Sequence, residues 1–223
     1  MSFFSMKKNF FFVLICFVII STPSFCFAEE TYNFYVEKDY SGAEKGTSDE
    51  PFKSIGKALE KAEINQIGER KIFIKKGSYQ EDLILGDSVK LQSEKNSVFI
   101  SGKISMKNNA EIKNIILEGD SSALSVEGNA NILIDGTEFR NSALDLLTAL
   151  PGNGKLTIKN STFNNGRKGA YIQRGRALDF YNNYFINNKE EGLDIRDGVS
   201  GSIESNFLSN NGESGIEFVI NES

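Results

Sequence analysis

The chain has 223 residues, of which 39% are hydrophobic and 25% are charged, and its formal net charge is −5 at pH 7. These values are ordinary for a globular protein, and the acidic balance argues against nucleic acid as the main partner. The sequence contains no histidine, which excludes Ser–His–Asp triads and histidine-ligated metals. Any catalysis would need carboxylates, Lys, Arg, Tyr or a hard cation bound by oxygens.

Residues 1–28 have the layout of a secretory signal peptide. Lys7 and Lys8 precede an apolar run from Phe10 to Ile20, and Ala28 offers a small residue for cleavage. The run is too short for a stable membrane span, and an uncleaved anchor is the alternative. We therefore expect a secreted protein, either extracellular or at the cell surface, with the periplasm as a further location.

Removal of this segment would change the chemistry of the mature chain. Cys16 and Cys26 are the two cysteines of the sequence, so no thiol or disulfide would remain. Loss of Lys7 and Lys8 would take the net charge from −5 to −7.

Residues 29–85 are predicted to hold an N-terminal strand, a capping helix and the first coil. An amphipathic helix is expected over Pro51–Ala62, followed by two strands, Ile72–Lys75 and Leu83–Leu85, on either side of Gly77–Tyr79. The first coil of a solenoid exposes a cross-section of its core, and such a helix can cover it.

Residues 86–223 are predicted to form the coils of a solenoid. From about Ala110 onward they repeat a short pattern: an apolar residue, then Asn or a small residue two positions later, then an apolar residue five positions later. The blocks recur at a nearly constant interval, which indicates stacked coils of about 23 residues. They are Ile112–Leu117, Ile134–Phe139, Ile158–Phe163, Phe180–Phe185 and Ile203–Leu208.

A second series of alternating apolar pairs lies between these blocks, as expected of short half-buried strands. The pairs recur at a similar interval, except for one longer step that contains the turn-rich segment Leu150–Gly154. They are Leu124/Val126, Leu144/Leu146, Ala170/Ile172, Leu193/Ile195 and Ile216/Phe218. The predicted fold is an all-β, right-handed parallel β-helix with an N-terminal amphipathic capping helix.

Asparagine recurs at the expected corners of the coils. Asn114, Asn160 and Asn182 share one position of the repeat with Gly136 and Ser205, where a bend between strands favours left-handed backbone angles. A second series of Asn pairs ends each turn and could form hydrogen bonds from coil to coil. Its members are Asn164–Asn165, Asn187–Asn188 and Asn210–Asn211.

These residues resemble the pectin-lyase-like superfamily of right-handed parallel β-helices. The resemblance rests on the entry pattern and on the later Asn/Phe repeats, and it covers essentially the whole mature chain. The entry pattern is Phe34–Val36, Gly46–Thr47, Pro51–Ile55, Ala58–Leu59, Ile72–Ile74 and Gly77–Tyr79. The superfamily includes polysaccharide lyases, glycoside hydrolases and proteins that only bind or scaffold, and no catalytic motif of theirs can be carried over.

Outward residues at one strand position should form a column about 4.8 Å apart. The resemblance implies that a substrate cleft would lie over the sheet formed by the second series. Its central position gives Ser125, Asp145, Tyr171, Asp194 and Glu217, and the position two later gives Glu127, Leu147, Gln173, Arg196 and Val219.

Asp194, Arg196 and Glu217 are the candidate catalytic residues. The two carboxylates would be neighbours, which is unfavourable unless something compensates their charge. Arg196 could neutralise them, which is the favoured interpretation, or the pair could hold Ca²⁺ or serve as a general acid and base on a glycan.

A basic segment surrounds the strand that carries Tyr171, with Arg167, Lys168, Arg174 and Arg176 as its cations. Tyr171 could stack on a sugar ring while arginines bind uronate carboxylates, and a solvated charged turn is the alternative. The candidate substrate-binding residues are Asp145, Tyr171, Gln173, Arg174 and Arg176.

Two functions stay open on this basis. The protein could bind or modify an extracellular, acidic polysaccharide, as a lyase or hydrolase if it is an enzyme, or it could be a non-catalytic surface or adhesion scaffold. The sequence stops directly after the predicted strand Ile216–Ile220. We expect this uncapped end either to self-associate or to continue in a missing segment.

Overall fold

The computed structural model describes residues 33–65, 68–119, 124–129 and 131–220. The predicted signal peptide, residues 1–28, lies outside these ranges. Within them, no helix is both long enough and apolar enough to cross a lipid bilayer.

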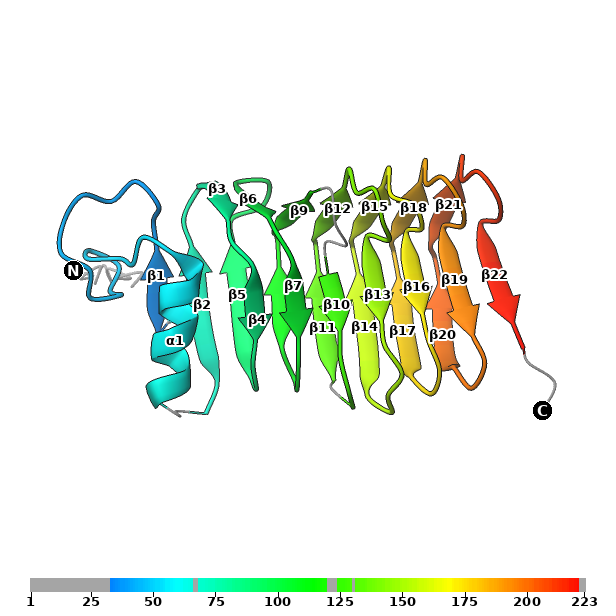
Figure 1. The fold of residues 1–223 in the computed structure, drawn as a ribbon, viewed down its shortest axis with the longest axis horizontal. Helices are drawn as coiled ribbons and strands as arrows, with labels where there is room; N and C mark the ends of the chain where they lie inside the picture. The colour runs from blue at the N-terminus through cyan, green and yellow to red at the C-terminus, as the bar shows by residue number, and fades with distance from the viewer. Residues whose placement is uncertain (1–32, 66–67, 120–123, 130, 221–223) are drawn as a thin grey trace, which may run out of the picture. The chain divides into compact units, whose positions relative to one another are not determined.

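Three parallel sheets build the fold, and each turn of the chain adds one strand to each sheet (Figure 1). The first sheet contains β1 (Phe34–Val36), β2 (Arg70–Ile74), β5 (Val89–Ser93), β8 (Glu111–Lys113), β11 (Ile132–Asp135), β14 (Lys155–Lys159), β17 (Ala177–Tyr181) and β20 (Ser200–Glu204). The second sheet contains β3 (Gly77–Gln80), β6 (Val98–Ser101), β9 (Ile116–Glu118), β12 (Glu138–Arg140), β15 (Thr162–Asn164), β18 (Tyr184–Ile186) and β21 (Phe207–Ser209). The third sheet contains β4 (Leu83–Leu85), β7 (Ile104–Met106), β10 (Leu124–Val126), β13 (Leu147–Ala149), β16 (Ala170–Ile172), β19 (Leu193–Arg196) and β22 (Ile216–Val219).

The parallel β-helix predicted from the repeats is confirmed. Ile134, Ile158 and Phe180 stand one above another on consecutive strands of the first sheet, as the repeat requires. The segment Gly77–Tyr79, which lies between two of the predicted strands, begins a strand of its own, β3. It pairs with β6, so the second sheet starts in the first coil.

The expected register is wrong at one coil of the third sheet. Leu147 and Ala149, rather than Leu144 and Leu146, pair with Leu124 and Val126. With this register, the strands from β10 to β22 follow one another at a constant interval, without the long step expected from the sequence. This segment has apolar residues at both its odd-numbered and its even-numbered positions, so hydrophobicity alone does not determine which set faces the core. Hydrogen bonding to the neighbouring strands determines the register.

The corners of the coils have the backbone that their sequence predicts. Asn114, Asn160 and Asn182 have φ values of 60°, 53° and 56°, and Ser205 has 55°. Gly136 has a φ of 60° at the same position, and a Cβ there would lie 2.6 Å from the Asn114 Oδ1 atom. Left-handed angles let the chain bend sharply between the first and second sheets.

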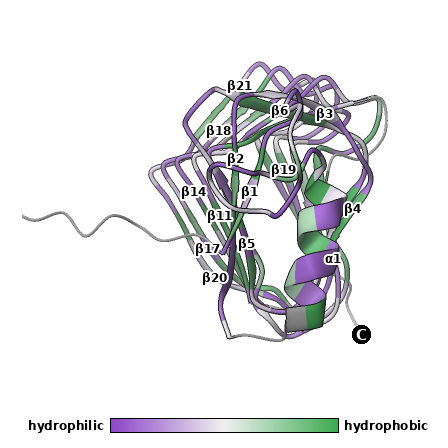
Figure 2. Cartoon of the chain, turned by 90° about the vertical axis from the view of Figure 1, so that its left-hand side faces the viewer, coloured by the Kyte–Doolittle hydropathy of each residue, from purple (hydrophilic) through white to green (hydrophobic). Residues whose placement is uncertain are grey.

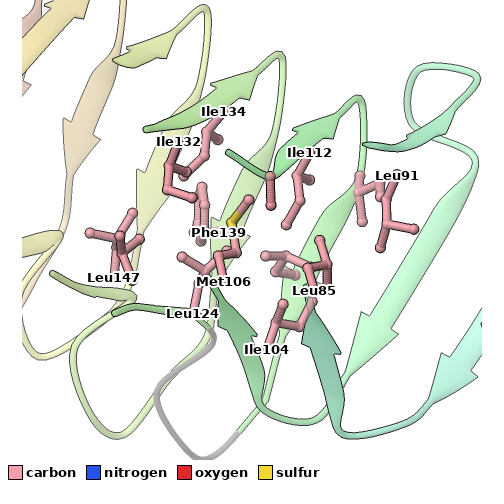
Figure 3. Packing of buried hydrophobic residues seen from close by; sticks show 14 of the residues in the cluster. Leu85, Leu91, Ile104, Met106, Ile112, Leu124, Ile132, Ile134, Phe139 and Leu147 are labelled. Atoms are coloured by element: carbon pink, nitrogen blue, oxygen red, sulfur yellow. The ribbon is translucent and has the colours of Figure 1, made fainter. Parts of the chain in front are cut away.

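The interior is a continuous apolar core to which all three sheets contribute (Figure 3). Phe139, Phe163 and Phe185 form a parallel stack inside the second sheet, with ring centroids 4.4 and 4.7 Å apart. In this register the separation of the rings follows the separation of the strands. The stack therefore ties three consecutive turns together.

Buried asparagines continue this stacking beside the phenylalanines. The Asn183 amide donates to the carbonyl of Ile158 and to Oδ1 of Asn206, at 2.8 and 2.9 Å. The Asn188 amide donates in the same way to the carbonyl of Phe163 and to Oδ1 of Asn211, at 3.3 and 2.9 Å. The predicted coil-to-coil hydrogen bonding of asparagine is confirmed, and it satisfies polar groups that water does not reach.

The N-terminal helix α1 spans Ile55–Asn65, so it begins four residues later than predicted. Phe52 lies outside it because it forms a parallel bridge with Val36. The Glu81 carboxylate accepts hydrogen bonds from the backbone of Ile55 and Gly56, at 2.9 and 2.8 Å. A negative charge at the first turn satisfies the exposed amides of the helix.

The apolar face of α1 packs against the core of the first coil, in contact with β1, β2 and β4 (Figure 2). Its buried residues are Ile55, Ala58, Leu59 and Ala62. This is the covering position that the amphipathic pattern predicts.

Apolar side chains are exposed on the last described turn. Phe218 is 62% exposed and Ile220 is 77% exposed. The residues equivalent to Phe218 in the two preceding turns, Ile195 and Ile172, are buried. The association expected at this surface stays a prediction.

We expect Phe163→Ala to lower the free energy of unfolding by about 3–5 kcal/mol, because it removes the middle ring of the stack and leaves a cavity. Urea denaturation followed by circular dichroism measures this change. Thr162→Ala, one residue away on the outer face, should change stability by less than about 0.5 kcal/mol. Equal effects of the two substitutions would contradict the role of the stack.

Candidate binding site on the third sheet

The outer face of the third sheet brings three of the predicted residues into one column. Tyr171, Asp194 and Glu217 are direct neighbours on β16, β19 and β22. Asp145 does not belong to this column, because Thr148 pairs with Tyr171 and takes its place. The column proposed from the sequence is therefore correct at its C-terminal end and wrong at Asp145.

Asp194 is the centre of an ion cluster. Its side chain is fully buried, and its Oδ2 atom lies 2.5 Å from Nζ of Lys168 and 2.5 Å from an Nη atom of Arg196. The same Arg196 nitrogen is 3.6 Å from the Glu217 carboxylate. Asp194 is thus compensated by two cations, and Arg196 links the two carboxylates of the predicted pair.

Lys168 belongs to a second column, at the turn that leads into the third sheet. Asp145, Lys168 and Glu191 occupy the same position of three consecutive coils, and all three are buried. Nζ of Lys168 lies 2.6 Å from a Glu191 oxygen, and Arg167 lies 2.9 Å from Asp145. Opposite charges in adjacent turns attract each other, so the positive charge of Lys168 offsets the negative charges of the acidic residues in the turns before and after it.

The protonation of this column follows from its burial and its ion pairs. Burial favours the neutral amine of Lys168, but the bonds to Asp194 and Glu191 outweigh it and raise the pKa. Burial also opposes ionisation of Glu191, yet the bond from Lys168 prevails and lowers its pKa. For Asp145, burial is the stronger effect, and the pKa is raised in spite of Arg167.

Glu191 was not among the candidates from the sequence. The signal that could have found it is its position one coil repeat after Lys168. A search for opposite charges separated by one repeat would have paired the two residues.

A groove of about 470 Å³ lies on the same face, next to the cluster. Four of the predicted site residues line it: Tyr171, Gln173, Arg174 and Arg196, together with Pro151 and Val219. The ring of Tyr171 lies against two cations, 5.7 Å from Nζ of Lys168 and 5.4 Å from the Arg196 guanidinium carbon. Arg174 is exposed and makes no ion pair with any residue in the described ranges.

Arg176 lies elsewhere, fully buried beneath the turn that follows β16. Its guanidinium donates to the backbone carbonyls of Leu150 and Gly128, at 3.0 and 2.6 Å. Burial lowers its pKa. These contacts place Arg176 among the residues that hold adjacent turns together and away from the groove.

The geometry favours charge neutralisation over the other two interpretations of the acidic pair. A general acid must contact the substrate, and the Asp194 side chain is fully buried, so a polymer cannot reach its carboxylate. Oxygens of Glu191, Asp194 and Glu217 lie within 4.8 Å of one another, a spacing that could hold a metal ion. Lys168 already provides the positive charge there, so a Ca²⁺ ion would have to displace it.

The comparisons agree with this architecture. The right-handed β-helix region family matches residues 102–223, more than half of the chain. The chain belongs to this family, in accordance with its resemblance to the pectin-lyase-like superfamily. No curated protein and no solved structure matches the chain.

We expect Lys168→Met to lower the free energy of unfolding by about 3 kcal/mol at neutral pH, because it leaves the buried Glu191 carboxylate without its cation and leaves Asp194 with Arg196 alone. The loss should shrink at acid pH. In the wild type, the lowered pKa of Glu191 contributes stability above its ordinary value of 4.5, and this stability is lost as the pH falls through the folded value. In the variant, Glu191 loses the hydrogen bond from Lys168 while burial still favours its protonated form, so the difference in the free energy of unfolding between the two proteins narrows below that pH.

Urea denaturation of both proteins between pH 3 and pH 8 (roughly the range in which carboxylates titrate) measures this difference. Lys189→Met is the matched control, since Lys189 is exposed in the next turn. A stability difference that stays constant across the range would contradict the ion cluster.

Proposed function

We propose that this protein is secreted and binds an acidic polysaccharide along the third sheet. The observation that carries the proposal is the groove in which Tyr171, Arg174 and Arg196 converge. A flat aromatic ring and two guanidinium groups suit a polymer of sugar rings that bear carboxylates.

The cluster beneath the groove supports binding by keeping Arg196 charged and in place. Burial works against the cationic form, but the hydrogen bond with Asp194 prevails and raises the pKa of Arg196. The Asp194 contact also fixes the guanidinium beside the ring of Tyr171. A guanidinium whose position is set in advance loses little entropy when it binds a carboxylate.

The same arrangement argues against Arg196 as the base of a lyase. Proton abstraction requires a neutral guanidine, and the raised pKa of Arg196 keeps it protonated. Among the described residues of the groove, binding is therefore better supported than β-elimination.

We expect Arg174→Ala to weaken binding to polygalacturonate or alginate about tenfold, because a charge-assisted hydrogen bond contributes about 1.5–3 kcal/mol. Affinity gel electrophoresis with each polymer in the gel measures the change. Binding should weaken further as salt is raised, since the contact is partly electrostatic. The matched control is Lys61→Ala, which removes an exposed cation from α1.

Two results would contradict the proposal. One is that the wild type shows no retardation by either polymer at low salt. The other is that Lys61→Ala weakens binding as much as Arg174→Ala, which would indicate nonspecific attraction. Incubation of the wild type with the same polymers, followed by assays for unsaturated products and reducing ends, tests separately for catalysis.

A further inference from the structure

A second groove, of about 500 Å³, lies on another face, along the corner between the first and second sheets. It extends over several turns of the solenoid and shares no residue with the groove on the third sheet. It is lined by Lys95, Asn96, Gly136, Thr137, Glu138, Asn160, Thr162, Asn182, Tyr184, Ser205 and Phe207.

Two exposed aromatic rings form one part of this groove. Tyr184 and Phe207 are direct neighbours on β18 and β21, at the outward position of the second sheet. They are 52% and 55% exposed, and their ring centroids lie 5.8 Å apart at an interplanar angle of 51°. Large rings that remain this exposed on adjacent strands mark an interaction surface.

The remainder of the groove is polar and close to neutral. Thr162 continues the outward column of Tyr184, and the corner residues Asn160, Asn182 and Ser205 lie beside it. The charged lining residues are one lysine and one glutamate, Lys95 and Glu138. Hydroxyls and amides therefore surround the rings, with no excess of either charge.

We propose that this groove binds a neutral glycan, with sugar rings packed on Tyr184 and Phe207. The C–H face of a sugar is apolar and fits against an aromatic ring, while its hydroxyls both donate and accept hydrogen bonds. Side-chain amides and hydroxyls at the corner can also both donate and accept hydrogen bonds, so they can pair with these sugar hydroxyls. A charged ligand would find no net opposite charge in this groove.

The repeat of the solenoid suits a repeating ligand. Adjacent strands are about 4.8 Å apart, close to the length that one sugar residue adds to an extended chain. A glycan along the solenoid axis would meet Thr162, Tyr184 and Phe207 in successive turns. The site is independent of the acidic-polysaccharide site proposed above, because it lies on a different sheet.

Isothermal titration calorimetry of the purified protein with cellohexaose, mannohexaose and xylohexaose tests this proposal. We expect at least one of these neutral hexasaccharides to bind. Tyr184→Ala and Phe207→Ala should each weaken that binding about tenfold through loss of stacking area. Tyr184→Phe should retain most of it, because the ring remains.

Phe218→Ala is the matched control, since Phe218 is similarly exposed on the same turn but lies outside this groove. It should leave the affinity unchanged. Absence of heat with all three hexasaccharides at millimolar concentration would overturn the proposal. So would equal losses in Phe207→Ala and Phe218→Ala, which would indicate nonspecific contact with exposed rings.

A parallel titration with hexagalacturonate separates this site from the one on the third sheet. Arg174→Ala should affect only the acidic ligand, and Tyr184→Ala only the neutral one. If Tyr184→Ala weakens binding of the acidic ligand alone, the proposal of a neutral-glycan site is wrong, while the observation of acidic-ligand binding remains valid. If the neutral ligand alone binds, the proposal for the third sheet is wrong and this one stands.

Discussion

The structure depends on the repeat that places each residue above its equivalent in the preceding turn. Parallel pairing at this interval places equivalent residues of adjacent turns side by side, so a residue type that stacks well stabilises every pair of turns in which it recurs. Inside, this yields the phenylalanine stack around Phe163 and the asparagine ladders that begin at Asn183 and Asn188. Each inner turn is held by its neighbours and cannot form its core alone.

The same repeat creates a difficulty for charged residues, because like charges would also stack. The turns that lead into the third sheet resolve it by alternating the charges. Lys168 stands between the acidic residues of the turns before and after it, and Arg196 reaches across from Asp194 to Glu217. The result is a set of ion-paired charges beneath the groove. The ion pair with Asp194, which Lys168 also contacts from the turn before β16, sets the orientation of Arg196.

The two grooves use the outer faces of one scaffold for different chemistry. On the third sheet, cations lie against a single ring, Tyr171. On the second sheet, Tyr184 and Phe207 lie among neutral polar groups. In both, the aromatic rings come from short strands whose inner side chains are fixed in the core, and residues of adjoining turns and corners complete the groove. A stacked fold can therefore present rows of side chains whose spacing suits a polymer.

The coil repeat, the left-handed corners at Asn114, Asn160 and Asn182, and the adjacency of Asp194 and Glu217 were determined by the sequence alone, because each depends on spacing between like residues. Three features were decided only by the tertiary structure. The segment around Leu147 has apolar residues in two alternative strand registers, and the pairing with the neighbouring strand determines which register forms. The burial of Arg176 depends on backbone carbonyls from two earlier turns. The pairing of Lys168 with Asp194 joins side chains from different positions of the repeat, which periodicity does not align. The spacing of residues in the sequence determines which of them stack on equivalent residues of adjacent turns. Three-dimensional packing determines which residues of different stacks contact each other.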